Sequence, residues 1–111
     1  MMARYVPEAG DIVWLAFDPQ AGREQAGHRP ALVLSPAAYN GKTSLMVCCP
    51  VTTRIKGYPF EVRIAGEPPS VALADQVKNL DWRARRATRK ARATAAELAE
   101  ARLKARTVIG A

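Results

Sequence analysis

A carboxylate, a guanidinium and a hydroxyl lie near the expected ends of strands in the first half of the chain, at Glu24, Arg29 and Thr52. Groups of these three kinds could remove a proton, neutralise a pentacovalent phosphate and hydrogen-bond its oxygens. Cleavage of RNA requires little more, because the substrate carries its own nucleophile, the 2′-hydroxyl. The residue types alone leave the matter open, since a Glu-x4-Arg pair is also typical of a solvated ion pair, and Thr52 of a strand end.

The sequence offers few residues that could bind a metal ion or a nucleotide cofactor. The chain has one histidine, His28, and its two cysteines, Cys48 and Cys49, are adjacent. Neighbouring residues of a strand point to opposite faces, so the two thiols cannot bind one ion together, and a disulfide between them would be strained. The stretch GREQAG lacks the lysine and the spacing of a phosphate-binding loop. We therefore expect no metal, no nucleotide cofactor and two reduced thiols in a cytoplasmic protein.

Positive charge is concentrated at one end of the chain. The net charge is +7, but residues 1–81 contain eight basic and eight acidic residues, whereas residues 82–111 contain nine basic and two acidic residues. A clustered cationic surface indicates a polyanionic partner, either nucleic acid or an acidic protein segment. A solvated basic face that only keeps the protein soluble is the alternative.

Short apolar runs separated by turn residues predict a mainly β protein. Strands are expected at 12–17, 31–35, 45–49, 60–64 and 71–73, with a surface loop at 18–28 and a turn at Asn40-Gly41. The first run is continuous rather than alternating, which indicates a strand covered on both faces. No run approaches the ~18 apolar residues of a membrane helix, and no signal peptide is visible, so we expect neither a membrane span nor export.

The C-terminal segment predicts one helix. Thr94 and Glu97 form a capping box, and Gly110 is placed to end the helix. Apolar residues recur between them at helical spacing: Leu98, Ala101, Ala105, Val108 and Ile109. Residues 83–93 show no apolar stripe of either period and receive no assignment. We expect residues 1–111 to form a single domain, a small and strongly curved or partly closed sheet with the helix packed outside.

A succession of short motifs points to a known family. The runs are RYVP (4–7), GDIVW (10–14), EQAGHRPA (24–31), PVTT (50–53), KGYPFE (56–61), VALADQVK (71–78) and WRAR (82–85). In this order and without obvious gaps, the chain closely resembles the MazF toxins of bacterial toxin–antitoxin pairs from residue 4 to at least residue 85. One such motif would be a weak signal, but the succession is specific.

The resemblance implies a mainly β fold with a C-terminal helix, the SH3-like small β-barrel of these toxins. It implies a sequence-specific, metal-independent endoribonuclease that cuts single-stranded RNA, chiefly mRNA. It also implies a homodimer that is neutralised by a cognate MazE-like antitoxin. The expected products carry a 2′,3′-cyclic phosphate and a 5′-hydroxyl.

The family's catalytic residues match three positions of this sequence. The arginine matches Arg29 in HRP, the threonine matches Thr52 in PVTT, and the assisting carboxylate matches Glu24. We expect Glu24 to act as general base on the 2′-hydroxyl, Arg29 to neutralise the phosphorane, and Thr52 to hydrogen-bond a non-bridging oxygen. An arginine suits its role because it stays charged and presents a planar fork to phosphate. The division of acid and base roles between Glu24 and Arg29 stays open.

Five further residues are candidates for binding RNA: His28, Arg54, Lys56, Gln76 and Lys78. His28 could contact RNA or serve as an acid, or it could be a loop histidine packed beside the next arginine. Arg54 and Lys56 could touch phosphate or lie in a solvated loop. Gln76 and Lys78 are expected in a strand formed by ADQVK, where they could line an RNA groove.

Four residues are candidates for contacting the antitoxin or another polyanion: Trp14, Arg85, Arg86 and Arg89. Trp14 is equally typical of a core or an interface, and could also stack on a base. The arginines could steepen the salt dependence of RNA binding or hold an acidic antitoxin tail. A solvated face is the third interpretation.

Two other functions are compatible with the same fold. A non-enzymatic toxin that binds a protein target such as DNA gyrase, as CcdB does, would not require Arg29 and Thr52. A basic barrel could also bind RNA without cutting it. The motifs EQAGHRP and PVTT favour the ribonuclease.

Overall fold

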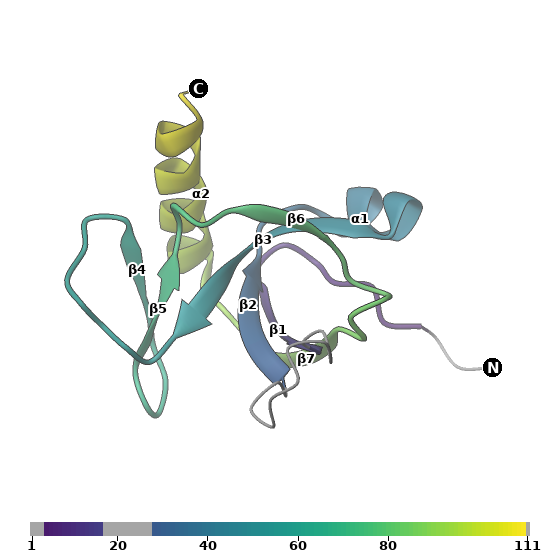
Figure 1. The fold of residues 1–111 in the computed structure, drawn as a ribbon, viewed down its shortest axis with the longest axis horizontal. Helices are drawn as coiled ribbons and strands as arrows, with labels where there is room; N and C mark the ends of the chain where they lie inside the picture. The colour runs from purple at the N-terminus through teal and green to yellow at the C-terminus, as the bar shows by residue number, and fades with distance from the viewer. Residues whose placement is uncertain (1–3, 17–27, 111) are drawn as a thin grey trace, which may run out of the picture.

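The computed structural model describes residues 4–16 and 28–110. Its elements are β1 (Asp11–Ala16), β2 (His28–Val33), α1 (Ala37–Thr43), β3 (Leu45–Thr52), β4 (Glu61–Ile64), β5 (Ser70–Leu73), β6 (Lys78–Asp81), β7 (Thr88–Arg92) and α2 (Ala95–Ile109). The strands pair antiparallel in the order β4-β5-β3-β2-β1-β7, and β6 pairs with β3 off this path (Figure 1). The expected loop at 18–28 lies outside the described residues except for His28, which begins β2.

The central strands are buried on both faces. Leu32 and Cys49 lie in one apolar cluster, which also contains the buried residues of α2. Val33 and Cys48 lie in a second cluster on the other face of the sheet. Because successive side chains point to opposite faces, the two cysteines enter different clusters, as the sequence predicts. This double burial explains the continuous apolar runs. The prediction of a mainly β fold, a strongly curved small barrel with a C-terminal helix, is confirmed.

Strand β3 changes partners along its length. Residues 45–48 pair with β6, whereas Val51 and Thr52 pair with β5. Both partners lie along the same edge of β3, because its other edge pairs with β2. The sheet therefore forks between these two stretches, and in Figure 1 the β4–β5 hairpin and β6 diverge from each other.

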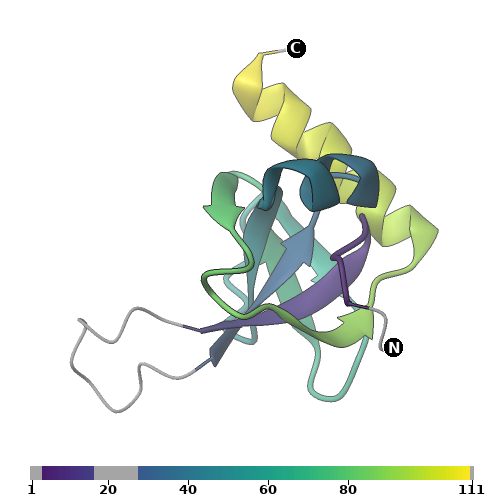
Figure 2. The ribbon, with the colours of Figure 1, turned by 90° about the vertical axis from the view of Figure 1, so that its right-hand side faces the viewer.

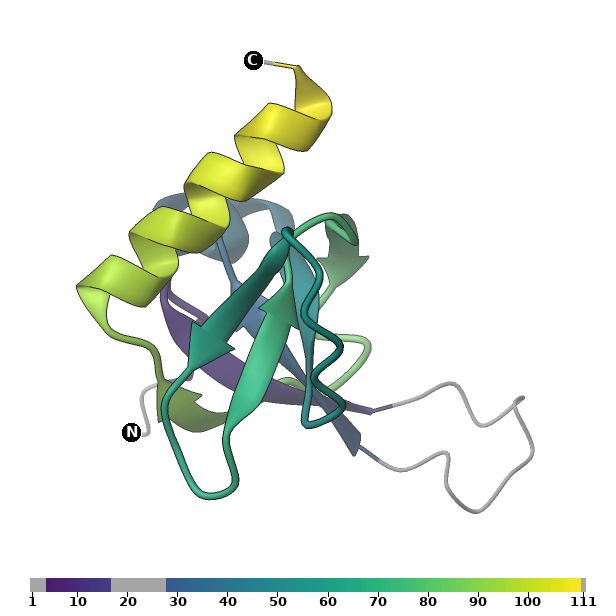
Figure 3. The same ribbon diagram turned by 90° about the vertical axis from the view of Figure 1, so that its left-hand side faces the viewer.

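Helix α2 begins and ends where the sequence predicts. The Thr94 hydroxyl accepts from the Glu97 N–H at 3.1 Å, and the Glu97 carboxylate accepts from the Thr94 N–H at 2.8 Å. Gly110 closes the helix in the left-handed conformation, at φ 95°. The helix crosses the molecule beside β4 and β5 (Figure 3) and buries Ala101 and Ala105 against the sheet.

Polar contacts also hold α2 on the sheet, but its last turn is not covered. The Arg102 guanidinium donates to the Leu34 carbonyl at 2.7 and 3.0 Å, and the Lys104 ammonium donates to a carbonyl of β4 at 3.0 Å. The helix then extends past the sheet, which leaves Val108 48% and Ile109 70% exposed. These two residues of the predicted apolar stripe lie in the helix but do not pack against the sheet.

Helix α1 occupies the place where a turn was expected. Asn40 lies inside this helix and is fully buried, and its amide donates to the carbonyls of Pro7 and Ser35 at 2.8 and 2.9 Å. The Trp82 indole donates to the Asn40 carbonyl at 2.9 Å. Pro7 and Trp82 are distant in sequence, so tertiary contacts override the Asn-Gly signal for a turn. Figure 2 shows α1 in front of α2, and Figure 1 shows that the two helices lie on opposite sides of the sheet.

The basic segment that received no assignment contains strand β7. It pairs with β1, and four of its five residues are exposed. The exposure explains why no apolar period marks it. The expected strand at ADQVK is also corrected, because Gln76 lies in the turn after β5 and only Lys78 begins β6. No helix in the described part of the chain is long and apolar enough to cross a membrane.

Candidate functional site

An open groove of about 1060 Å³ gathers most of the residues that the sequence singles out. Its polar and aromatic lining includes Trp14, His28, Arg29, Thr52, Thr53, Arg54, Lys56, Tyr58, Gln76, Lys78, Arg85 and Lys90. These residues come from β1, β2, β3, β6 and β7 and from the connections that follow β3, β5 and β6. The groove thus lies where the sheet forks.

Arg29 and Thr52 lie on neighbouring strands at the same end. The register of β2 and β3 pairs Val33 with Cys48 and Ala31 with Pro50. Arg29 lies two residues before Ala31 on β2, and Thr52 lies two residues after Pro50 on β3. Because side chains alternate along a strand, the two residues project from the same face. The strand pairing thus brings together a guanidinium and a hydroxyl that are 23 positions apart in the sequence.

The Thr52 hydroxyl is held in place by the chain that follows it. Its oxygen accepts from the Arg54 N–H at 3.1 Å. A hydroxyl that accepts one hydrogen bond still carries its own hydrogen to donate. At the rim of the groove, this donor suits an oxygen of a bound phosphate.

The electrostatic character of the groove is positive. Basic side chains line it from several elements, whereas its acidic lining residues are Glu61 and Glu67. The Lys56 ammonium lies 5.9 Å from the Tyr58 ring centroid, and the Lys90 ammonium lies 5.2 Å from the Trp14 ring. Such a surface attracts a polyanion and offers aromatic faces beside the charges.

The basic segment after residue 82 does not form one surface. Arg85 lines the groove, whereas Arg86 lines a separate pocket of about 290 Å³ with Arg4 and Arg83. Arg89 instead lies 3.9 Å from the Asp11 carboxylate. The structure therefore separates the three arginines that were grouped as one polyanion contact.

A β-bulge in β7 explains how neighbouring basic residues of this strand project from different faces of the sheet. Ile12 pairs with Ala91 and Val13 with Arg89, so Lys90 is an extra residue without a partner on β1. A bulge shifts the alternation of side chains by one. Arg89 and Arg92 consequently reach the same carboxylate, while Lys90 turns to the groove beside Trp14.

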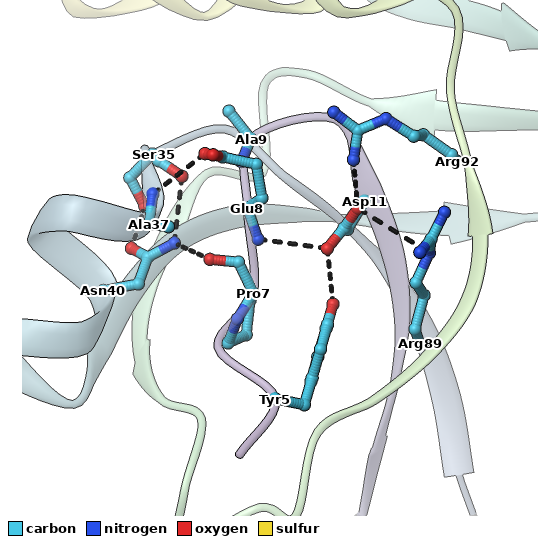
Figure 4. Close-up of polar contacts among 10 residues, drawn as sticks. All are labelled: Tyr5, Pro7, Glu8, Ala9, Asp11, Ser35, Ala37, Asn40, Arg89 and Arg92. Carbon is cyan, nitrogen blue, oxygen red and sulfur yellow. Dashed lines mark hydrogen bonds and ion pairs between the residues drawn. The ribbon is translucent and has the colours of Figure 1, made fainter. Parts of the chain in front are cut away.

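Around Asp11 lies a compact polar cluster, which we call the Asp11 knot: Tyr5, Glu8, Asp11, Arg89 and Arg92 (Figure 4). The Asp11 carboxylate, in a residue only 2% exposed, accepts from the Tyr5 hydroxyl at 2.5 Å, the Glu8 N–H at 3.0 Å and Arg92 at 2.6 Å. Burial and the hydrogen bond to Asp11 raise the pKa of Tyr5 well above its usual range. The knot joins the N-terminal segment to β1 and β7, away from the groove-lining residues.

The cysteines are not placed for catalysis. Burial raises the pKa of Cys48 to about 11 and that of Cys49 to about 12, so both remain thiols at neutral pH. Among residues 4–16 and 28–110, no three histidine, cysteine or acidic side chains gather where they could hold a metal.

Sequence reasoning and structure differ at a few site positions. Glu24 lies outside the described residues. Lys90 and Tyr58 line the groove but were not singled out, nor was Glu61 at its base. Lys90 lies in the unassigned segment. Tyr58 and Glu61 lie within the motif KGYPFE, which could have directed attention to them.

The chain matches known proteins over nearly its whole length. Residues 8–109 match the family model of PemK-like, MazF-like toxins of type II toxin–antitoxin systems. The endoribonuclease toxin MazF of Escherichia coli K12 is 55% identical over 111 residues, covering 99% of this chain and all of that protein. This chain belongs to the MazF-like toxin family. It is accordingly an endoribonuclease toxin of a type II toxin–antitoxin system.

Solved structures agree with the fold. A MazF crystal structure from Deinococcus radiodurans superposes with a TM-score of 0.85 at 58% identity, covering 97% of this chain and 100% of that one. A MazE–MazF complex from the same organism gives a TM-score of 0.85 at 53% identity, covering 96% and 98%. The curved sheet with its C-terminal helix is thus the MazF fold, and the non-enzymatic alternative does not apply.

Proposed function

We propose that the groove binds single-stranded RNA and that cleavage occurs where Arg29 and Thr52 share one end of the sheet. The placement of these two residues on one face, at the rim of a cationic groove, carries the proposal. Single-stranded RNA suits an open, positively charged surface with exposed aromatic rings better than a duplex does.

The proposed reaction uses the three side chains that match the family's catalytic residues and needs no metal. Glu24 removes the 2′-hydroxyl proton, and the 2′-oxygen attacks the adjacent phosphorus. Arg29 neutralises the phosphorane with its planar fork, while the Thr52 hydroxyl donates to a non-bridging oxygen. The bond from phosphorus to the 5′-oxygen breaks, and that oxygen takes up a proton from water, while Glu24 returns the proton it removed to the solvent. The products are a 2′,3′-cyclic phosphate and a 5′-hydroxyl.

The other lining residues are assigned to binding. Lys78, Arg54 and Arg85 contact phosphates along the groove, and His28 and Gln76, which also line it, contact bases or sugars. Phosphate contacts position the strand, whereas contacts to base edges select the sequence that is cut.

We further propose that the chain acts in the cytoplasm as a homodimer and is neutralised by a MazE-like antitoxin. The Deinococcus MazE–MazF complexes support the antitoxin. The two buried free thiols fit a reducing compartment. Of the three candidate arginines, Arg85 lines the groove and Arg89 lies beside Asp11. Arg86 lies outside the groove and is therefore the remaining candidate for contacting an acidic antitoxin segment.

Cleavage of a single-stranded RNA in excess EDTA tests the function. The wild-type protein should give discrete fragments with 5′-hydroxyl ends, and Arg29→Ala should slow their formation by at least about 100-fold. Arg63→Ala is a matched control, because Arg63 is an exposed arginine of β4 that does not line the groove. Intact RNA after incubation with the folded wild type, across varied sequences, would contradict the proposal. Equal rates for Arg29→Ala and Arg63→Ala would contradict the site.

A further inference from the structure

The connection between β3 and β4, residues 53–60, forms one wall of the groove without belonging to a helix or strand. We call it the β3–β4 loop. Its residues 53–59 are all exposed, and it presents Arg54, Lys56 and Tyr58 to the groove. An exposed loop that must meet a ligand in one shape loses conformational entropy on binding unless something orders it beforehand.

One buried carboxylate closes this loop. Glu61, the first residue of β4, is 9% exposed and accepts from the Lys56 N–H at 3.0 Å and the Gly57 N–H at 2.9 Å, one bond to each oxygen. The Glu61 N–H also donates to the Tyr58 carbonyl at 3.1 Å. Gly57 adopts φ 86°, a left-handed conformation that lets the chain turn around the carboxylate.

Glu61 is itself fixed from the other side. The Lys104 ammonium of α2 donates to its carbonyl at 3.0 Å and pairs with Glu100 at 3.0 Å. Helix α2 therefore fixes the position of Glu61, and Glu61 in turn fixes the β3–β4 loop.

A carboxylate at the base of a cationic groove is unexpected, because it repels the polyanion that the groove attracts. Its two backbone hydrogen bonds offset this cost, since a carboxylate is the side chain that can accept one N–H on each of two oxygens. The same contacts set the position of Lys56, whose ammonium lies 5.9 Å from the Tyr58 ring, and the Tyr58 side chain is 53% exposed.

We propose that Glu61 is a positioning residue for RNA binding, which orders the β3–β4 loop so that Lys56 meets a phosphate and the Tyr58 ring stacks on a base. This inference rests on the proposed binding of RNA in the groove. Glu61 acts through the loop and does not touch the reacting atoms. Aromatic rings beside cations are the usual platforms for single-stranded nucleic acids.

The variant Glu61→Gln tests the role with little change of shape. The amide keeps one acceptor oxygen and turns an N–H donor toward the other backbone N–H, so one loop contact is lost. The dissociation constant for a labelled single-stranded RNA, measured by fluorescence anisotropy, should rise about tenfold. The Lys56 and Gly57 amides should exchange with solvent about tenfold faster or more. The maximal cleavage rate at saturating RNA should change less than about twofold.

A matched control separates positioning from general stability. Glu97 also accepts from two backbone N–H groups, those of Thr94 at 2.8 Å and Ala65 at 2.9 Å, but it holds the start of α2 rather than the loop. Glu97→Gln should lower the melting temperature at least as much as Glu61→Gln and leave the affinity for RNA within about twofold.

A double-mutant cycle decides whether Glu61 acts through the loop side chains. In a chain that carries Lys56→Ala and Tyr58→Ala, Glu61→Gln should weaken binding by less than about twofold, because the side chains it positions are gone. A full tenfold effect in that background, or no effect in the wild-type background, overturns the inference. If the loop variants do not weaken binding while Arg29→Ala abolishes cleavage, the inference fails and the proposed function stands. The anisotropy measurement reports binding and not cleavage. It therefore tests the role of the loop even if the wild type cuts no RNA.

Discussion

Two regions of this molecule are rich in arginine and lysine, and they use these residues in opposite ways. In the Asp11 knot, Arg92 lies 2.6 Å from a buried carboxylate. In the groove, Lys78 and Arg85 belong to none of the ion pairs found in residues 4–16 and 28–110, which join Asp11 to Arg89 and Arg92 and Glu100 to Lys104. A paired arginine holds the fold together, whereas an unpaired one keeps its field for a ligand.

Strand β7 supplies both regions from adjacent residues. Arg89 belongs to the knot and Lys90 to the groove. Net charge in the sequence therefore does not measure the charge available to RNA. The neighbours of each side chain decide it, and here one bulge residue makes the division.

The largest effect on stability is expected from Asp11→Ala. It should lower the free energy of unfolding by about 3 kcal/mol, because the Tyr5 hydroxyl, the Glu8 N–H and Arg92 all lose their acceptor. Urea denaturation at neutral pH measures the change. Arg85→Ala, on the groove side, should cost less than about 0.5 kcal/mol. Equal losses from the two variants would abolish the distinction between knot and groove.

The salt dependence of RNA binding should separate the two regions next. Replacing Lys78 and Arg85 by glutamine should reduce the slope of log affinity against log salt by about 1.4 in total, or ~0.7 for each lost phosphate contact. At a fourfold change in salt this corresponds to about sevenfold in affinity. The paired control, Arg89→Gln with Arg92→Gln, should leave the slope unchanged in the folded protein. A decrease of equal size in the control would show that the knot also contacts RNA.

A smaller gain in stability is expected at Arg86, which lines the second pocket. It adopts φ 52°, a left-handed conformation that disfavours residues with a Cβ atom. Arg86→Gly should therefore raise the free energy of unfolding by up to about 1 kcal/mol in thermal or urea denaturation. Arg86→Ala removes the guanidinium but keeps the Cβ, so it should give no such gain. If alanine stabilises as much as glycine, relief of charge repulsion and not of backbone strain is the cause.

The smallest effect at neutral pH is expected from Glu8→Gln. The N–H groups of Ala37 and Ala9 lower the pKa of Glu8. A folded-state pKa below the unfolded one adds stability that is present above the unfolded pKa and lost as pH falls through the folded pKa. Both bonds go to one oxygen, which glutamine retains, so stability should change by less than about 0.5 kcal/mol near pH 7. Below about pH 4, the variant should lose less stability than the wild type. Parallel acid profiles would contradict this role of Glu8.

Local signals predicted those parts of the fold that local contacts stabilise. Helix α2 is set by its capping box and by Gly110, all within its own segment. Helix α1 could not be predicted in this way, because its buried Asn40 is satisfied by the distant Pro7 and Trp82. Strand β7 could not either, since an exposed strand held by pairing with β1 has no apolar period.

The candidate site shows the same division. The motifs around Arg29 and Thr52 marked both residues, and the strand register explains why they meet. The roles of Asp11 and Glu61 were not predictable from residue types, because most of their hydrogen-bond partners are backbone groups or residues distant in sequence. An acidic residue can be recognised in a sequence, but what it holds in place depends on the fold.

The divided pairing of β3 places two strands, β5 and β6, along one edge of β3. Strands β2 and β3 contribute to both apolar clusters, and β5 adds Ala72 to one of them, whereas the opening depends on how far β5 and β6 diverge along the other edge of β3. The turn that joins β5 to β6 spans only residues 74–77. Residues inserted at the exposed Asp75 and Gln76 would change the mouth of the groove and leave the buried Ala74 and the pairing of β2 with β3 in place. The shape of the groove can therefore change at this turn while Arg29 and Thr52 keep their places on β2 and β3.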